Sequence, residues 1–332
     1  MTAAIEAYRA ALTVRSAEAT PMDWAGTQNN LGAALHSLGA REGDPALLTA
    51  AIEAYRAALT VRSAEATPMD WAGTQNNLGA ALHFLGAREG DPARLTAAIK
   101  AYRAALTVRS AEATPMGWAR IQNNLGAALH SLGEFEGDPA HLIGAIEAYH
   151  AALTVYTAEA VPMDWAGTQN NLGNVLSTLG NSDDAPSHLN EAIAAYRAAL
   201  TVYTAETAPM DWAGTQNNLG ISLRWPGTLE RNPDRFAAAR DAYDACVTDR
   251  TRDAAPFLWA QTQWNLADLA LAWRTLDPQA ARLDTAQTHL DAARTVFTEA
   301  ENTHQIAECD RLQRLINEAR AAAGAAPPPD NP

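Results

Sequence analysis

Residues 21–59 read PMDWAGTQNNLGAALHSLGAREGDPALLTAAIEAYRAAL, and this stretch decides the fold because it recurs along the chain. Segments 2–48 and 49–95 differ at only two positions, where Ser37 corresponds to Phe84 and Leu47 to Arg94. The period of 47 residues is marked by a tryptophan, at Trp24, Trp71, Trp118, Trp165, Trp212 and Trp259. Repeats of about 20–50 residues are typical of solenoids, in which each unit packs on the next. The sequence therefore predicts an array of one repeated unit.

Each unit is predicted to contain two antiparallel helices. The first is expected to begin after Thr20 as its cap, with Pro21 in the first turn, and to end at Gly39. The second begins by the same logic at Asp44 and Pro45. The apolar positions that share one face are Trp24, Leu31, Leu35 and Leu38 in the first helix and Leu48, Ile52, Tyr55 and Leu59 in the second. Neither helix can bury this face alone, so stacking must form one continuous core, to which we assign the tryptophan column as well.

The repeated positions carry a resemblance to a known family. They are Leu31-Gly32, Gly39, Ala51, Tyr55, Ala58 and the closing Pro68. In this order they resemble the tetratricopeptide repeat, whose usual unit has about 34 residues. The longer unit here predicts longer helices and a wider turn, and it also resembles arrays attached to bacterial signalling NTPases and caspase-like proteases. The resemblance implies an all-α fold, a right-handed α-solenoid of antiparallel helix pairs, which binds proteins or peptides in a concave groove.

The array is predicted to occupy residues 1–302. It starts with a half repeat, residues 2–20, and continues with helix pairs that begin near residues 21, 68, 115, 162, 209 and 256. We expect a capping helix at 303–323 and a disordered tail, rich in Ala and Pro, at 324–332. The half repeat has one uncovered side. Either this side forms a homodimer, or the helix belongs to a longer array or tolerates exposure.

Composition argues against several classes of function. The chain has 24 Lys and Arg against 38 Asp and Glu, a net charge of −14, whereas nucleic-acid surfaces need clustered cations. We therefore expect no nucleic-acid partner and no anionic membrane partner. The sequence contains no stretch of 18 apolar residues and no signal-peptide pattern at its start, so we expect a cytoplasmic location. The two cysteines, Cys246 and Cys309, match no metal-ligand spacing, and motifs such as GxGxxG or HExxH are absent. The sequence predicts no catalytic residue, no metal and no cofactor, and hence a protein that is not an enzyme.

The strongest candidate for binding is a repeated asparagine pair on the first helix. A side-chain amide both donates and accepts hydrogen bonds, which suits an extended peptide backbone. In the tetratricopeptide family an asparagine matching Asn30 often contacts peptide. The alternative is that these asparagines bond to adjacent repeats. The candidate residues are Asn29, Asn30, His36, Asn76, Asn77, His83, Phe84, Asn123, Asn124, His130, Asn170, Asn171, Asn217, Asn218, Trp225 and Asn265.

The other members of this set have simpler alternatives. His36 and its equivalents repeat at the same period, so they are too far apart for one metal site and are expected to line the surface or groove. Phe84 and Trp225 share one column and are either apolar anchors for a partner or packing variants. The leading hypothesis is a scaffold for protein interactions. The alternatives are a ligand-sensing arm of a signalling assembly and a spacer that self-associates through its N-terminal helix.

Overall fold

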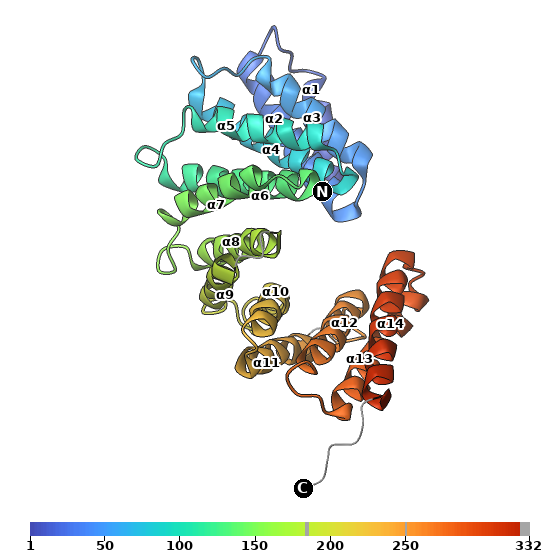
Figure 1. Cartoon of the computed structure of the whole chain (residues 1–332). Coiled ribbons are helices and arrows are strands. Elements are labelled where there is room, and N and C mark those ends of the chain that lie inside the picture. Colours follow the sequence, from blue (N-terminus) through green and yellow to red (C-terminus); the bar gives the residue numbers. More distant parts are fainter. Residues whose placement is uncertain (183–185, 250, 326–332) are drawn as a thin grey trace. The chain divides into compact units, whose positions relative to one another are not determined.

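The structure is a computed structural model that describes residues 1–182, 186–249 and 251–325 (Figure 1). Within these ranges the chain forms fourteen α-helices and no strand, which confirms the predicted all-α fold. The helices are α1 (Thr2–Leu12), α2 (Pro21–Glu42), α3 (Pro45–Leu59), α4 (Pro68–Glu89), α5 (Pro92–Leu106), α6 (Pro115–Glu136), α7 (Pro139–Leu153), α8 (Pro162–Ser182), α9 (Pro186–Ala199), α10 (Pro209–Leu229), α11 (Pro233–Asp249), α12 (Pro256–Trp273), α13 (Ala280–Glu299) and α14 (Thr303–Ala325).

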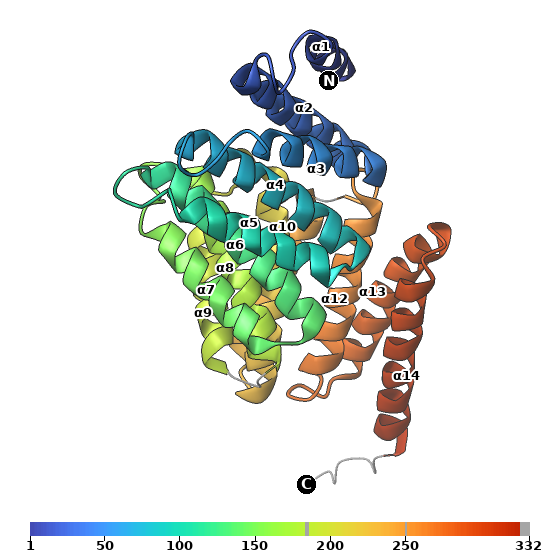
Figure 2. The same cartoon turned by 90° about the horizontal axis from the view of Figure 1, so that it is seen from above.

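The helices form two compact units, Met1–Val175 and Leu176–Pro332. In the first unit, α2 to α7 pack side by side in chain order, as both views show (Figures 1 and 2). In the second unit, α10 packs on α11, α12 on α13, and α13 on α14. The first helices of neighbouring pairs also touch, α2 with α4, α4 with α6, and α10 with α12. Each unit is thus a stack of helix pairs of the α-solenoid type, with the first helices next to one another.

A buried tyrosine packs against a glycine of the first helix in the helix pairs that keep the repeat sequence. Tyr55 of α3 is 1% exposed, and so are its equivalents in later repeats, Tyr102, Tyr149, Tyr196 and Tyr243. The ring lies directly against the backbone of the first helix. A Cβ atom at Gly32 would lie 2.8 Å from Cε1 of Tyr55, so only glycine lets the two helices approach this closely. This contact explains why Leu-Gly and the tyrosine recur together in the repeat.

The ends of the helices correct two predictions. Gly39 does not end the first helix, because it is buried and its backbone touches the second helix, where an added Cβ would lie 3.0 Å from Cγ of Leu48. The helix instead ends one turn later at Gly43, whose φ of 66° is the left-handed conformation that favours glycine. Thr20 makes no side-chain cap bond, whereas the carboxylate of Asp44 caps α3 by accepting from the backbone N–H of Ala46 at 2.8 Å.

The tryptophan column is a further correction, since its members are half-buried rather than core residues. They lie in the first turn of each first helix, close to the loop that joins the repeats. Trp118 and Trp165, for example, pack at the margin of a small cluster formed by Ala119, Ala152 and Tyr156. The large apolar residues that are buried in the first helix are the leucines, such as Leu31, Leu35 and Leu38.

The last helix, α14, packs on α13 and also touches α12. It begins at Thr303, which is 47 residues after Pro256, the first residue of α12, so it takes the place of the first helix of a seventh repeat. Cys309, Leu312 and Ile316 bury its apolar face against the α12–α13 pair. The helix extends to residue 325, two residues beyond the predicted boundary. The rest of the predicted disordered tail, 326–332, lies outside the described residues.

Candidate functional site

The asparagine pairs form hydrogen bonds between neighbouring repeats. In each case the second asparagine of one pair donates from Nδ2 to Oδ1 of the first asparagine in the preceding repeat. The bonds are Asn77 to Asn29 at 3.2 Å, Asn124 to Asn76 at 3.1 Å, Asn171 to Asn123 at 3.4 Å and Asn265 to Asn217 at 2.9 Å. Because the same bond recurs at every one of these steps, it holds adjacent first helices in one register.

This ladder uses part of each amide's hydrogen-bonding capacity. Neighbouring asparagines use more of it, since Nδ2 of Asn29 lies 3.4 Å from Oδ1 of Asn30, and Nδ2 of Asn76 lies 3.5 Å from Oδ1 of Asn77. Asn30 is exposed and Asn76 is buried, while the other ladder residues, including Asn170 and Asn218, are half-buried. The bonding between repeats that we had weighed as an alternative is therefore present. Peptide contact by the same residues remains a prediction.

In the histidine column of the first unit, His83 and His130 contact neighbouring polar side chains, whereas Nε2 of His36 is buried without a hydrogen-bond partner. His83 Nε2 lies 3.0 Å from Oγ of Ser131, and His130 Nε2 lies 3.4 Å from a carboxylate oxygen of Glu134. Burial lowers the pKa of His36, and burial followed by the charge of His130 lowers the pKa of His83. These contacts describe packed side chains. Among the described residues no group of three His, Cys, Asp or Glu is placed to hold a metal ion.

The two aromatic candidates differ in their surroundings. Phe84 is 38% exposed, and the ring of His36 meets it edge-on at 6.1 Å between centroids. Trp225 is half-buried, and its indole N–H is buried without a hydrogen-bond partner. Phe84 therefore presents an apolar surface to solvent, and Trp225 is less exposed. A role for either residue as an anchor for a partner remains a prediction.

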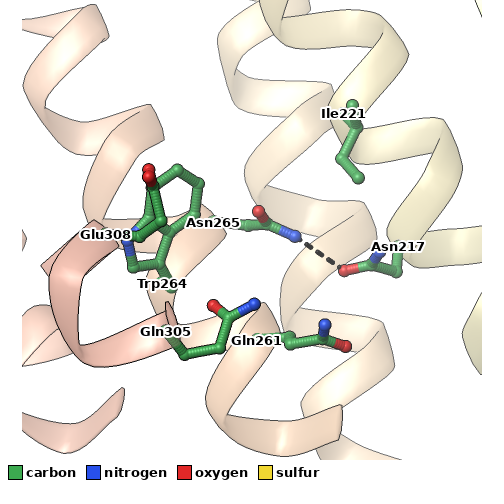
Figure 3. A pocket seen from close by; sticks show the side chains of 7 residues that line it. All are labelled: Asn217, Ile221, Gln261, Trp264, Asn265, Gln305 and Glu308. Atoms are coloured by element: carbon green, nitrogen blue, oxygen red, sulfur yellow. Dashed lines mark hydrogen bonds between the residues drawn. The ribbon is translucent and has the colours of Figure 1, made fainter. Parts of the chain in front are cut away.

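A pocket in the second unit brings two asparagines of the ladder together with residues outside the predicted binding set. It has a volume of about 270 Å³ and lies between α10, α12 and α14 (Figure 3). Its lining residues are Asn217, Ile221, Gln261, Trp264, Asn265, Gln305 and Glu308. In Figure 3 the amides of Gln305 and Asn265 lie between Trp264 on one side and Asn217 on the other. Two of the predicted residues, Asn217 and Asn265, thus belong to this pocket.

Departures from the repeat create the rest of the lining. Gln261 occupies the column that is glycine in most copies, such as Gly26 and Gly73, and Trp264 occupies the column of Asn29. Extending the period of 47 residues into α14 places Glu308 in the same column as Gln261. These changes were visible in the sequence as breaks in the period. Gln305 carried no comparable signal, because α14 has little sequence similarity to the repeat.

The pocket offers several polar groups that have no partner. Among the described residues, the side-chain amides of Gln261 and Gln305 make no hydrogen bond, and the indole N–H of Trp264 is buried without a partner. The amides of Asn217 and Asn265 are bonded to each other at 2.9 Å. Gln261 and Gln305 are half-buried, so only the Trp264 N–H bears the cost of about 1–3 kcal/mol that a buried unpaired donor carries. An occupant that supplies matching groups would therefore be stabilised here.

A second cavity is less suited to binding. It has a volume of about 140 Å³ and is lined by side chains of α11, α12 and α13 around Trp273. Its two arginines are already engaged, since Arg282 pairs with Asp277 at 3.1 Å and Arg240 with Asp241 at 2.6 Å. The Arg282 guanidinium also stacks on the Trp273 ring, 3.9 Å from its centroid. These groups satisfy one another, so we take the pocket between α10, α12 and α14 as the candidate site, because its lining includes unpartnered polar groups.

Comparison with known proteins agrees with the fold. A family model described as a tetratricopeptide repeat matches residues 165–201, which include most of α8 and all of α9. Since that segment is one copy of the repeated unit, the chain is a helical-repeat protein, and its repeats are of the tetratricopeptide type. No curated protein matches the chain. No described helix is both long and apolar enough to cross a lipid bilayer.

Three solved structures are similar at low identity. BtubC (BKLC) from P. vanneervenii is 20% identical over 88% of this chain and 94% of its own, with a TM-score of 0.42. A Rap protein complexed with competence and sporulation factor is 11% identical over 89% and 76%, with a TM-score of 0.43. The TPR2AB domain of yeast Sti1, in its pHSP90 complex, is 17% identical over 88% and 98%, with a TM-score of 0.28. All three scores lie below 0.5, which is too low to support an inference about function.

Proposed function

We propose that the chain is a non-enzymatic protein-interaction scaffold, which binds an extended polypeptide segment in a groove along its first helices. The observation that carries this proposal is the set of unpartnered polar groups around the pocket, the amides of Gln261 and Gln305 and the indole N–H of Trp264. Amides both donate and accept, and each residue of a polypeptide supplies one donor and one acceptor. A polypeptide backbone therefore matches this lining. The tetratricopeptide character of the repeats supports the same class of function.

The asparagine ladder has a supporting role in this proposal. Its bonds between repeats hold the first helices at a constant spacing, so that amides such as Asn217 and Asn265 reach the pocket in a defined orientation. The exposed Asn30 and the partly exposed Phe84 are proposed as weaker contact points in the first unit. Association of two chains through α1 remains a prediction.

The test uses peptides selected without prior assumption. A random library of linear dodecapeptides displayed on phage is panned on the immobilised full chain, and the selected peptides are synthesised and measured by fluorescence anisotropy. The double variant Gln261→Ala/Gln305→Ala should bind them at least about fivefold more weakly, since two hydrogen bonds of about 0.5–1.5 kcal/mol each are lost. Gln279→Ala is the matched control, because Gln279 is exposed and makes no side-chain cap bond.

Two results would contradict the proposal. One is that the selected peptides bind the double variant as tightly as the unmodified chain. The other is that no selected peptide binds the unmodified chain measurably in solution. Thermal unfolding of all variants, followed by circular dichroism, shows whether a lost affinity comes from lost structure.

A further inference from the structure

Glu308 is the only charged residue among the seven that line the pocket. Its nearest ion-pair partner, Arg311, lies on the same helix at 3.7 Å and is 70% exposed. Exposed pairs of this kind contribute little, because water screens both charges. The carboxylate of Glu308, itself 35% exposed, is therefore available to another cation.

The apolar part of the lining suits a long basic side chain. Trp264 and Ile221 supply apolar surface in the same pocket. Lysine and arginine carry an aliphatic stem that packs on such surfaces, while the charged group at its end contacts water or polar groups. The face of an indole ring also attracts an ammonium or guanidinium group directly. A carboxylate and an indole in one pocket thus favour a cation with an apolar stem.

The same pocket disfavours anions. None of its lining residues is a lysine or arginine, so an acidic side chain or a terminal carboxylate would face Glu308 with no positive partner in the lining. Arg311, the nearby cation, lies outside the lining and points into solvent, being 70% exposed. The net charge of −14 adds a long-range attraction for basic segments and a repulsion for acidic ones.

We propose that this pocket selects polypeptide segments that present a lysine or arginine side chain, with Glu308 as the specificity-determining residue. This inference rests on the proposed function and deepens it. The basic group lies at Glu308, its stem packs on Trp264, and the adjoining peptide groups bond to the amides of Gln261 and Gln305. The selectivity is confined to the last helix pair and α14, because Glu308 and Trp264 have no counterpart in the other repeats.

The experiment compares the full chain with Glu308→Gln and Glu308→Lys, and with Glu318→Gln as an exposed control on the same helix. Dodecapeptides selected by phage display on the unmodified chain are the probes, each synthesised with its basic residues replaced one at a time by norleucine.

We expect Lys or Arg to be enriched at one aligned position of the selected peptides. Norleucine there should weaken binding about tenfold for the unmodified chain and for Glu318→Gln, since a hydrogen bond to a charged group is lost. For Glu308→Gln the same replacement should change affinity by less than about twofold. Panning on Glu308→Lys should instead enrich Asp or Glu.

The outcomes separate the two proposals. The charge selectivity is wrong if no basic residue is enriched, or if norleucine weakens binding to Glu308→Gln as much as binding to the unmodified chain. The proposed function still holds in that case, provided that binding depends on Gln261 and Gln305. If no peptide binds the unmodified chain, the proposed function fails and the selectivity fails with it.

Discussion

Two glycines in one helix allow a direct test of how the repeat is packed. Gly73 and Gly79 both lie in α4, six residues apart. A Cβ atom at Gly73 would meet no atom within 4 Å, whereas one at Gly79 would lie 2.7 Å from Cε1 of Tyr102. Tyr102 is 1% exposed, so its ring has no free space into which to move. The two sites therefore differ only in the room available for one methyl group.

The expected sizes of the two effects follow from this difference. Alanine is favoured over glycine inside a helix by up to about 1 kcal/mol, and both Gly73→Ala and Gly79→Ala gain this amount. Overpacking a well-packed core costs about 1–3 kcal/mol, and only Gly79→Ala incurs that cost. Gly73→Ala should therefore stabilise the chain by up to about 1 kcal/mol, and Gly79→Ala should be less stable than Gly73→Ala by about 1–3 kcal/mol.

The assay is urea unfolding followed by far-ultraviolet circular dichroism, with free energies from linear extrapolation. A third chain, Gly79→Ala with Tyr102→Leu, provides the contact control. If the clash is with the ring, the loss caused by Gly79→Ala should shrink once the ring is removed, so that the two substitutions are not additive. The reasoning is refuted if Gly79→Ala stabilises the chain as much as Gly73→Ala does.

Three further predictions concern bonds and titration. Substituting Asn29 and Asn77 by alanine singly and together should reveal a coupling of about 0.5–1.5 kcal/mol in urea unfolding, and strict additivity would argue against a bond between them. Burial raises the pKa of five equivalent tyrosines, which are Tyr55, Tyr102, Tyr149, Tyr196 and Tyr243. Above pH ~10 the unfolded chain therefore loses phenol protons that the folded chain keeps. Stability is thus intact below that pH and falls by about 1.4 kcal/mol per tyrosine and pH unit above it, and tyrosinate absorbance should appear together with the loss of helix rather than before it. The pKa of His83 is lowered instead, so its contribution is intact above pH ~6.5 and is lost as the pH falls; His83→Gln should make the unfolding midpoint less sensitive to acid, and an unchanged sensitivity would contradict this.

The repeat period made most of the fold predictable from the sequence. A proline and the adjoining polar residue mark where helices begin, as at Asp44, because such a cap depends on a few neighbouring residues. The end of the first helix was harder, since both Gly39 and Gly43 are plausible stops in the sequence. Only the tertiary structure distinguishes them, because Gly39 is needed for contact with Leu48, whereas Gly43 adopts a positive φ. Local patterns do not contain that information.

The candidate site was predictable only in part, for a related reason. The repeated asparagine pair predicted binding residues, and two of them, Asn217 and Asn265, line the pocket. The residues that distinguish the pocket are those that break the repetition, Gln261 and Trp264. Gln305 comes from α14, and its place in the pocket depends on how that helix packs against α12.

The position of the pocket follows from where the asparagine ladder ends. At four steps of the ladder, an asparagine of one repeat bonds to an asparagine of the repeat before it, as Asn265 does to Asn217. The next step would pair position 264 with position 312, and these are Trp264 and Leu312. Replacing both partners of a buried hydrogen bond by apolar groups costs little, so the stack can continue into α14 without the ladder. Identical repeats present identical surfaces, whereas this change leaves an indole, two unpartnered amides and one carboxylate at a single place. Selective recognition is therefore expected where the copies diverge rather than along the copies that are alike.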